Sequence, residues 1–301
     1  MKNQDLKAVE SPFFGTNRTE LVPTACFSVE SMKSLFAVVT GLSADAREIE
    51  FAKLTPQPKQ SLKEFNQIKT TSEALFVPKI FLTTYESEMF SSSDPSIFDD
   101  PKIPVSVKLI VIDSCPEYMV QLNRRPANWL RIELDLTKPE IFDLNLGPSE
   151  PTPNQSNFVI NGQDGNWSRS AHSKLTQALS EARTHRSILH RRNIYDIYIL
   201  FGVFPIIFFL FLRITPLASP HLDQLPDLNR FLLFFWIFIL LITLFRIAFN
   251  YTRWVFPYIE FVGRNHRKHW TQLIWAAITV PIIGGLVWQA FVSLSDFLLG
   301  R

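Results

Sequence analysis

The chain has 301 residues, of which 47% are hydrophobic, and its formal net charge is +2. This length allows one soluble domain together with a membrane region, and the near-neutral charge gives no indication of nucleic-acid binding. Two isolated cysteines, Cys26 and Cys115, exclude a disulfide framework and favour a reducing cytoplasm. The first residues contain no apolar stretch of the kind found in a cleaved signal peptide.

The first elements are predicted from the spacing of apolar side chains. Residues 1–24 carry scattered charges without a period, and we expect a loosely ordered leader. Residues 28–40 place apolar side chains three and four positions apart, which predicts a helix with Ser28 as its N-cap and Gly41 as its stop. Residues 46–54 alternate apolar and charged side chains, which predicts a half-buried strand.

Several further strands follow along the chain. Residues 75–85 are rich in β-branched and aromatic side chains, but Pro78 removes a ladder donor and suggests an edge or a bulge. Residues 105–112 give the strongest strand, and we expect it at the centre of a sheet. Residues 129–136 alternate clearly, and residues 158–160 add one more short strand.

This order of elements predicts an α+β cytosolic domain over residues 25–166, with a mainly antiparallel sheet and flanking helices. A linking helix over residues 167–193 follows it and contains the basic junction. Nothing between Ser168 and Pro205 breaks a helix, so we expect one continuous helix that runs into the membrane. Such a helix is either a stiff stalk or a route for a signal.

Residues 194–301 form the predicted transmembrane region of about three helices. Apolar runs cover residues 194–212, 231–249 and 273–294. A helix of about 20 residues crosses the hydrocarbon core of a bilayer, so each run is long enough to span it. For the third run, a re-entrant or interfacial segment is the alternative. Arg246, near the end of the second run, is expected to reach the headgroups.

Basic residues give the orientation. Lys and Arg beside spanning segments favour the cytoplasmic side, and the prolines and balanced charges of residues 213–230 indicate a short external loop. The N-terminal domain is therefore expected in the cytoplasm and the C-terminus outside, with an aromatic, basic segment at residues 253–264 lying at the cytoplasmic interface and facing anionic lipids. The predicted membrane-orienting residues are Arg183, Arg186, Arg191, Arg192, Arg253, Arg264, Arg267 and Lys268.

The third run contains the residues that we expect to pack helices together. Pro281, Gly284 and Gly285 would kink or thin this segment and let another helix approach closely. The neighbouring helix belongs either to the same chain or to another copy. A homo-oligomer or a partner protein is therefore expected in addition to the lipid bilayer.

The sequence contains none of the common motifs for nucleotide binding, zinc proteolysis or serine hydrolysis. Asp113, Ser114 and Cys115 follow the strongest strand, where catalytic groups often lie, but ordinary turn chemistry explains them equally well. His266 and His269 are three residues apart, yet the cations around them disfavour a metal. We predict no catalytic residue, no metal and no cofactor.

A ligand site is not identified by the sequence. Scattered surface cations and a pocket for an anionic ligand are both compatible with one set of basic side chains. These are Lys102, Lys108, Arg124, Arg125 and Arg131.

The layout resembles that of uncharacterised bacterial inner-membrane proteins with a cytosolic N-terminal domain and C-terminal transmembrane helices. The matching pieces are residues 167–192, the aromatic FPYIEF segment at 256–261 and the basic run at 264–268. The resemblance implies a location in a bacterial inner membrane and brings no activity.

Two function classes remain open. The first is a membrane-anchored sensor or scaffold, including an effector of a bacterial stress or anti-phage system. The alternative is a membrane-tethered enzyme that acts through a cleft of the cytosolic domain.

Overall fold

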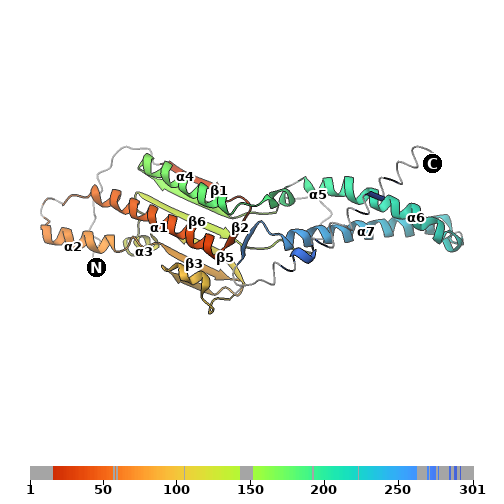
Figure 1. Cartoon of the computed structure of the whole chain (residues 1–301), viewed down its shortest axis with the longest axis horizontal. Helices are drawn as coiled ribbons and strands as arrows, with labels where there is room; N and C mark the ends of the chain where they lie inside the picture. Colours follow the sequence, from red (N-terminus) through yellow and green to blue (C-terminus); the bar gives the residue numbers. More distant parts are fainter. Residues whose placement is uncertain are drawn as a thin grey trace. The chain divides into compact units, whose positions relative to one another are not determined.

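The computed structural model describes residues 16–56, 58, 60–104, 106–142, 152–191, 193–222, 224–262 and individual residues between 270 and 292. The chain divides into two compact units (Figure 1). The first unit comprises Met1–Thr137, Asn154–Thr184 and Ile259–Arg264. The second unit comprises Lys138–Pro153, His185–Tyr258 and Asn265–Arg301.

The first unit is built on a six-stranded sheet in which all neighbouring strands are antiparallel. The strand order is β1-β7-β6-β5-β3-β4. The predicted mainly antiparallel sheet is therefore confirmed. Its strands are β1 (Thr16–Leu21), β3 (Lys79–Thr84), β4 (Met89–Ser92), β5 (Val107–Asp113), β6 (Asn128–Asp135) and β7 (Asn157–Gly162).

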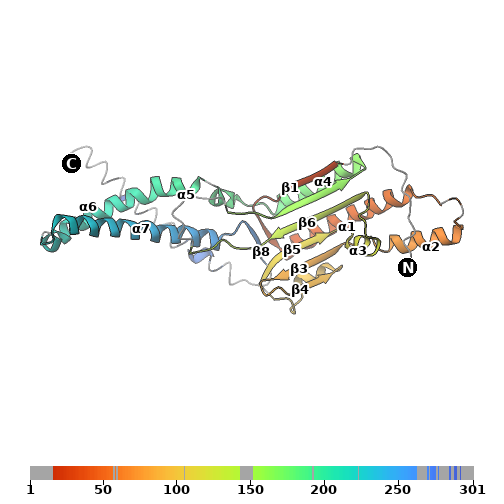
Figure 2. The ribbon, with the colours of Figure 1, turned by 180° about the vertical axis from the view of Figure 1, so that it is seen from behind.

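Two long helices lie on one face of this sheet (Figures 1 and 2). They are α1 (Val29–Ala52), which packs on β6, and α4 (Gly165–Glu181), which packs on β7 and on α1. Alternate residues of β6 (Leu130, Ile132 and Leu134) are fully buried, as the period-two pattern requires. Shorter helices complete the unit: α2 (Leu62–Glu73), the 3₁₀ helix η1 (Pro95–Asp99) and α3 (Pro116–Leu122).

Helix α1 is longer than its pattern indicates. Ser28 caps it as predicted, because its side chain accepts a hydrogen bond from the Ser31 N–H. The predicted stop at Gly41 is wrong, and so is the predicted strand at residues 46–54, because the helix continues to Ala52. Its buried face also continues, so tertiary packing outweighs the cost of a helical glycine, about 1 kcal/mol.

The predicted strands at residues 105–112, 129–136 and 158–160 correspond to β5, β6 and β7. Strand β5 lies in the interior of the sheet, as expected for the most apolar strand. Strand β3 begins directly after Pro78 and is paired on both sides, so β4 forms the edge there. The edge or bulge expected at Pro78 is therefore not found, because the proline lies just before the strand and removes no ladder donor; a register shift occurs instead between Thr83 and Thr84.

Part of the predicted leader is ordered, contrary to expectation. Thr16–Leu21 forms the edge strand β1, paired with β7 over six residues. The Thr16 hydroxyl contacts the Ser168 hydroxyl at 2.9 Å, which fixes the start of the strand to α4. Periodicity could not reveal β1, because all six of its side chains are exposed.

A second, two-stranded sheet brings distant parts of the chain together in the first unit. Strand β2 (Ala25–Ser28) runs parallel to β8 (Ile259–Val262). The predicted interfacial segment at residues 253–264 is therefore corrected in its second half, which forms a strand. Phe27 and Ile259 are both buried, so this pairing belongs to the core of the unit.

The predicted continuous helix from Ser168 to Pro205 is also wrong. Helix α4 ends at Glu181, and Arg183 then forms an antiparallel bridge with Ala25. A backbone hydrogen bond explains why α4 ends here. The Ala182 carbonyl accepts from the Cys26 N–H at 2.9 Å and not from an N–H of a further helical turn.

The second unit contains two helical segments long and apolar enough to cross a membrane, Ile194–Pro216 and Asp227–Val255. The first is built from α5 (Ile194–Ile197), the π-helical turn η3 (Tyr198–Val203) and α6 (Phe204–Leu222). The second is α7 (Asp227–Val255), and a 3₁₀ helix, η2 (His185–His190), precedes both.

The connection between the two spans is shorter than predicted. We expected a loop over residues 213–230, but the backbone of α6 continues to Leu222 and α7 begins at Asp227. Of the third predicted span, the residues described are helical, and they include Gly285. Pro281 and Gly284 lie outside the described residues.

Candidate functional site

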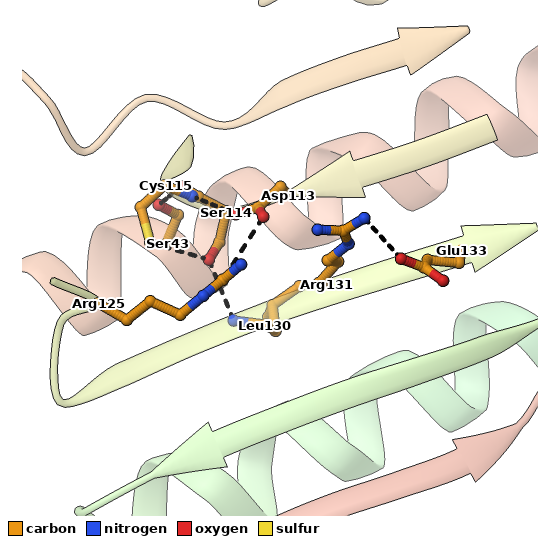
Figure 3. A network of polar contacts seen from close by, with 8 residues as sticks. All are labelled: Ser43, Asp113, Ser114, Cys115, Arg125, Leu130, Arg131 and Glu133. Carbon is orange, nitrogen blue, oxygen red and sulfur yellow. Dashed lines mark hydrogen bonds and ion pairs between the residues drawn. The ribbon is translucent and has the colours of Figure 1, made fainter. Parts of the chain in front are cut away.

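A buried polar network lies where β5 ends, at the position of the sequence's catalytic candidates (Figure 3). The Ser43 hydroxyl of α1 donates to the Ser114 carbonyl at 2.8 Å. The Leu130 N–H of β6 donates to the Ser114 Oγ at 3.0 Å. Ser43 and Ser114 are both buried, so the network fastens α1 to two central strands without exposing a reactive hydroxyl.

Asp113 completes this network from the last position of β5. Its carboxylate accepts from the Cys115 N–H at 3.1 Å and faces Arg125 at 3.5 Å. Arg125 also lies over the Trp129 ring, 3.9 Å from the ring centroid. The carboxylate and the guanidinium thus satisfy each other at the end of the strand, which is the arrangement expected of a structural turn.

The Cys115 thiol is expected to be unreactive. The side chain is buried, and burial raises the pKa of its thiol to about 12, although the hydrogen bond with Ser114 opposes the shift. Its neighbour is a hydroxyl, at 3.5 Å, and not an imidazole that could remove the proton. A protonated, enclosed thiol is a poor nucleophile, so this position gives no support for catalysis.

The five basic residues weighed as an anion pocket have different surroundings. Arg124 donates to the Tyr118 hydroxyl at 3.1 Å, and Arg131 pairs with Glu133 at 2.6 Å. Lys108 is exposed on the sheet. Arg125 pairs with Asp113, the residue opposite Arg131 in the sheet, so these two cations adjoin each other and each has an acidic partner. Ion pairs within the chain favour scattered cations over a pocket for an anion.

No group of three or more His, Cys, Asp or Glu side chains suited to a metal ion occurs within the described residues. His266 and His269 lie outside them.

The second unit contains a different cluster, which we call the junction cluster: Thr152, Leu189, His190, Arg253 and Phe256. Arg253, in the last turn of α7, donates from Nε to the Leu189 carbonyl at 2.8 Å. Its guanidinium also lies 4.7 Å from the Phe249 ring centroid. Arg253 is buried, so a residue predicted to orient the protein at the membrane surface also holds backbone inside the unit.

His190 is the second buried member of the junction cluster. Its Nε2 lies 2.9 Å from the Phe256 carbonyl, so this nitrogen carries the proton and donates it. Nδ1 faces the Thr152 hydroxyl at 2.9 Å. Burial lowers the pKa of His190 to about 4, and the charges of Arg253 and Arg186 act in the same direction, while the bond to Phe256 opposes them. The imidazole is therefore neutral near pH 7.

Aromatic side chains continue from this cluster along the helices. Tyr195 and Tyr198 both contact Phe249, with ring centroids 5.3 and 5.2 Å apart. The Arg246 guanidinium lies 5.3 Å from the Tyr195 ring centroid, and Arg246 is buried. Its side chain thus packs against the preceding helix, and its reach to the headgroups stays a prediction.

A shallow, open apolar groove of about 370 Å³ lies between α6 and α7. Thr215 provides the one hydroxyl of its wall, and the remaining lining is aromatic. The lining residues are Phe211, Thr215, Phe231, Phe234, Phe235 and Phe238.

The start of the third run is fixed to the end of α7. The Gln272 side-chain amide donates to the Val255 carbonyl at 2.9 Å. The Trp275 indole donates to the Thr252 hydroxyl at 3.2 Å, and its ring packs edge-on against Tyr251.

The predicted orienting residues are not gathered in one place. Arg183 belongs to the bridge in the first unit, whereas Arg186 lies over the Phe256 ring in the second. Arg191 is exposed. Arg192, Arg264, Arg267 and Lys268 lie outside the described residues, so the orientation itself stays a prediction.

Comparison with other proteins adds no further assignment. The chain matches no family model, and neither the curated proteins nor the solved structures include a similar one.

Proposed function

We propose that this protein is a membrane-anchored sensor or scaffold. Its first unit lies in the cytoplasm and binds a partner, and its apolar helices anchor the chain in a bacterial inner membrane and associate with other copies. One observation carries this proposal. The helix Asp227–Val255 is highly apolar, yet only 6% of its most apolar stretch is buried within the protein.

The exposure of α7 distinguishes a membrane helix from the core helix of a soluble protein. A core helix of a soluble protein is apolar because other elements cover it. Here large side chains such as Phe231 and Trp236 are about two-thirds exposed, at 65% each. Exposed apolar surface on this scale is unfavourable in water and favourable in lipid. A bilayer is the environment that removes the conflict.

A specific form of the function is a membrane effector in a bacterial stress or anti-phage system. In this form, assembly of the first units reorganises the helices and permeabilises the membrane. The second unit has suitable parts, since a π-helical turn interrupts the first span at Tyr198–Val203 and an open apolar groove lies between α6 and α7. Neither the β5 network nor the unreactive thiol of Cys115 favours the enzymatic alternative.

The experiment must keep the chain whole. Truncation after Arg192 would remove β8, which pairs with β2 inside the first unit, and would therefore damage the part to be preserved. A point substitution is sharper. Leu240 lies near the middle of α7 and is 57% exposed, whereas Leu228 lies in its first turn and is 67% exposed. An arginine at a helix centre opposes insertion by about 2.5–3.5 kcal/mol, and much less at its end.

Wild type, Leu240→Arg and Leu228→Arg are expressed at matched levels. We expect wild type and Leu228→Arg to stay in membranes washed with alkaline carbonate, and Leu240→Arg to be released. In cells, the first two lower the membrane potential and the third does not. Release of the wild type by carbonate would overturn the anchor. A normal potential with assembled, inserted protein would overturn the effector form.

A further inference from the structure

The outer edge of β1 is the least protected surface of the sheet. All six residues of the strand are exposed, and the apolar side chain of Leu21 is 68% exposed. Strand β1 ends the strand order, and on the described residues β7 is its one neighbour. An edge strand presents unpaired N–H and C=O groups that can pair with another strand. The opposite edge, β4, has four residues and is thus a shorter template.

The register with β7 shows which backbone groups of β1 point outward. Just beyond the strand, the Val22 N–H donates to the Ser156 carbonyl at 3.0 Å, in the same register as the pairs of β1 and β7. Residues in an antiparallel pair alternate between bonding to the neighbour and pointing away from it. The even-numbered residues therefore bond to β7. The outward-facing backbone belongs to Asn17, Thr19 and Leu21.

The charged side chains of β1 both lie on the helix side of the sheet. Arg18 is opposite Ile160 and Glu20 is opposite Phe158, two residues that are buried under the helices. The Glu20 carboxylate lies 2.8 Å from His172 Nε2 on α4. Two opposite charges, two positions apart on one face of an exposed edge, form a self-complementary pattern.

We propose that β1 pairs antiparallel with β1 of a second copy across a two-fold axis that passes between the two Thr19 residues. This inference rests on the proposed function, because it supplies the contact through which cytosolic units associate. In this register Arg18 of each copy faces Glu20 of the other, and Asn17 faces Leu21. The outward N–H and C=O groups of three residues per strand then bond to those of the second strand, and the two sheets become continuous.

Charge selects this register from its neighbours. The pleat allows only shifts of two residues, because a shift of one would place side chains on the wrong face. A shift of two in one direction sets Arg18 opposite Arg18, and in the other direction Glu20 opposite Glu20. Like charges directly opposite each other are unfavourable. Among the registers that keep the faces, those centred on Thr19 and on Arg18 overlap equally, so charge and not length decides between them.

Disulfide trapping in native membranes tests the contact with the full chain. Opposed residues of a bonded antiparallel pair have Cα atoms about 5.5 Å apart, within the range that a disulfide bridges. We expect Thr19→Cys, in a Cys26→Ser background, to give a covalent dimer on mild oxidation. Met89→Cys on edge strand β4, which is 69% exposed, is the matched control and should stay monomeric.

Charge reversal then tests the register. Arg18→Glu and Glu20→Arg should each lower the Thr19→Cys dimer yield about fivefold, because each places like charges opposite one another. The double variant restores opposite charges and should restore the yield. His172→Gln removes the contact of Glu20 within its own copy, together with a ring contact to Phe158, and leaves the charges of β1 unchanged, so its yield should match that of Thr19→Cys alone.

The outcomes separate this inference from the anchor. Carbonate extraction is measured on the same samples. Retained protein with no Thr19→Cys dimer, or with equal dimer from Met89→Cys, would overturn the pairing and leave the anchor intact. A double variant as weak as the single variants would overturn it too. An adduct whose mass is not twice that of the chain would assign the edge to another protein.

Discussion

In the second unit, Arg253 Nε donates a hydrogen bond to the Leu189 carbonyl at 2.8 Å, and Arg253 Nη2 donates one to the Arg191 carbonyl at 3.4 Å. One buried guanidinium thus holds the backbone of the basic junction against the end of α7. A fork of fixed donors suits this task, because Arg presents several N–H groups in one plane. The residue therefore combines a predicted role in orientation with an observed role in folding.

Replacing Arg253 by lysine distinguishes its role in orientation from its role in holding the backbone. Arg253→Lys keeps the positive charge, so the orientation should hold, but the fork is lost and a buried carbonyl loses its donor. We expect Arg253→Lys and Arg253→Ala both to destabilise the full chain in detergent, by about 1–3 kcal/mol. Thermal unfolding followed by size-exclusion chromatography measures this. Arg213→Ala, at an exposed position of α6, is the control. Wild-type stability of Arg253→Lys would show that the charge alone matters.

His190 predicts how stability depends on pH. Its pKa falls from the ordinary 6.5 to about 4 in the fold, mainly because burial disfavours the charged imidazole. Between these values the unfolded chain binds more protons, so stability decreases as the pH falls from 6.5 towards 4. The fall in pKa corresponds to on the order of 3 kcal/mol at the acid end of this window.

Unfolding temperatures of the detergent-solubilised chain between pH 7.5 and 4.5 test this dependence. His190→Gln should flatten the decrease, because it removes the titrating group. A decrease that is as steep in His190→Gln as in wild type would assign the acid sensitivity to other groups.

Strand pattern and capping chemistry predicted much of the first unit. Strands β5, β6 and β7 and the Ser28 cap were foreseeable, because local alternation and a local hydrogen bond determine them. The strand expected at residues 46–54 was not, since AREIEFAKL satisfies both periods and packing of Ala46 and Phe51 in α1 decides between them. Long-range pairing was invisible, because nothing local marks Ile259–Val262 as the partner of β2.

In the candidate sites, too, local features were predictable from the sequence and long-range contacts were not. Sequence reasoning recognised Arg253 as a cation near a membrane but could not foresee that its partners are carbonyls more than 60 positions earlier. His190 lies in the basic junction, where the sequence does not distinguish it from its neighbours, although burial strongly lowers its pKa. The end of α4 was missed because the helix stops at hydrogen bonds to residues 24–26, and not at a breaker in its own sequence.

The thiol of Cys115 gives a direct test of the enzymatic alternative. With a pKa of about 12, its thiolate fraction at pH 8 is about a thousandfold below that of a thiol with a pKa of 9. We expect iodoacetamide to label Cys26 in the native protein and Cys115 only after denaturation, as measured by peptide mass spectrometry. Rapid native labelling of Cys115 would indicate an accessible, activated thiol and would favour an enzyme.

Ser114 is expected to stabilise the first unit. Replacement by alanine removes the acceptor of the buried Leu130 N–H, which costs about 1–3 kcal/mol. Ser43→Ala removes the hydroxyl that donates to the Ser114 carbonyl and should cost about 1 kcal/mol. Urea titration of tryptophan fluorescence in the full chain compares the two. Equal stability of Ser114→Ala and wild type would show that the buried network does not stabilise the first unit.

The proposed function requires the hairpin of α6 and α7 to cross a membrane twice, with the first unit in the cytoplasm. A cysteine at Leu225, which is 38% exposed in the turn between the spans, probes the far side. A cysteine at the exposed Glu86, in the turn between β3 and β4, probes the first unit. Both are introduced into the full chain with Cys26→Ser and treated with a membrane-impermeant maleimide in spheroplasts.

We expect Leu225→Cys to be labelled in intact spheroplasts and Glu86→Cys to be labelled only after lysis. Protection of Leu225→Cys until lysis, or labelling of Glu86→Cys in intact spheroplasts, would contradict this topology.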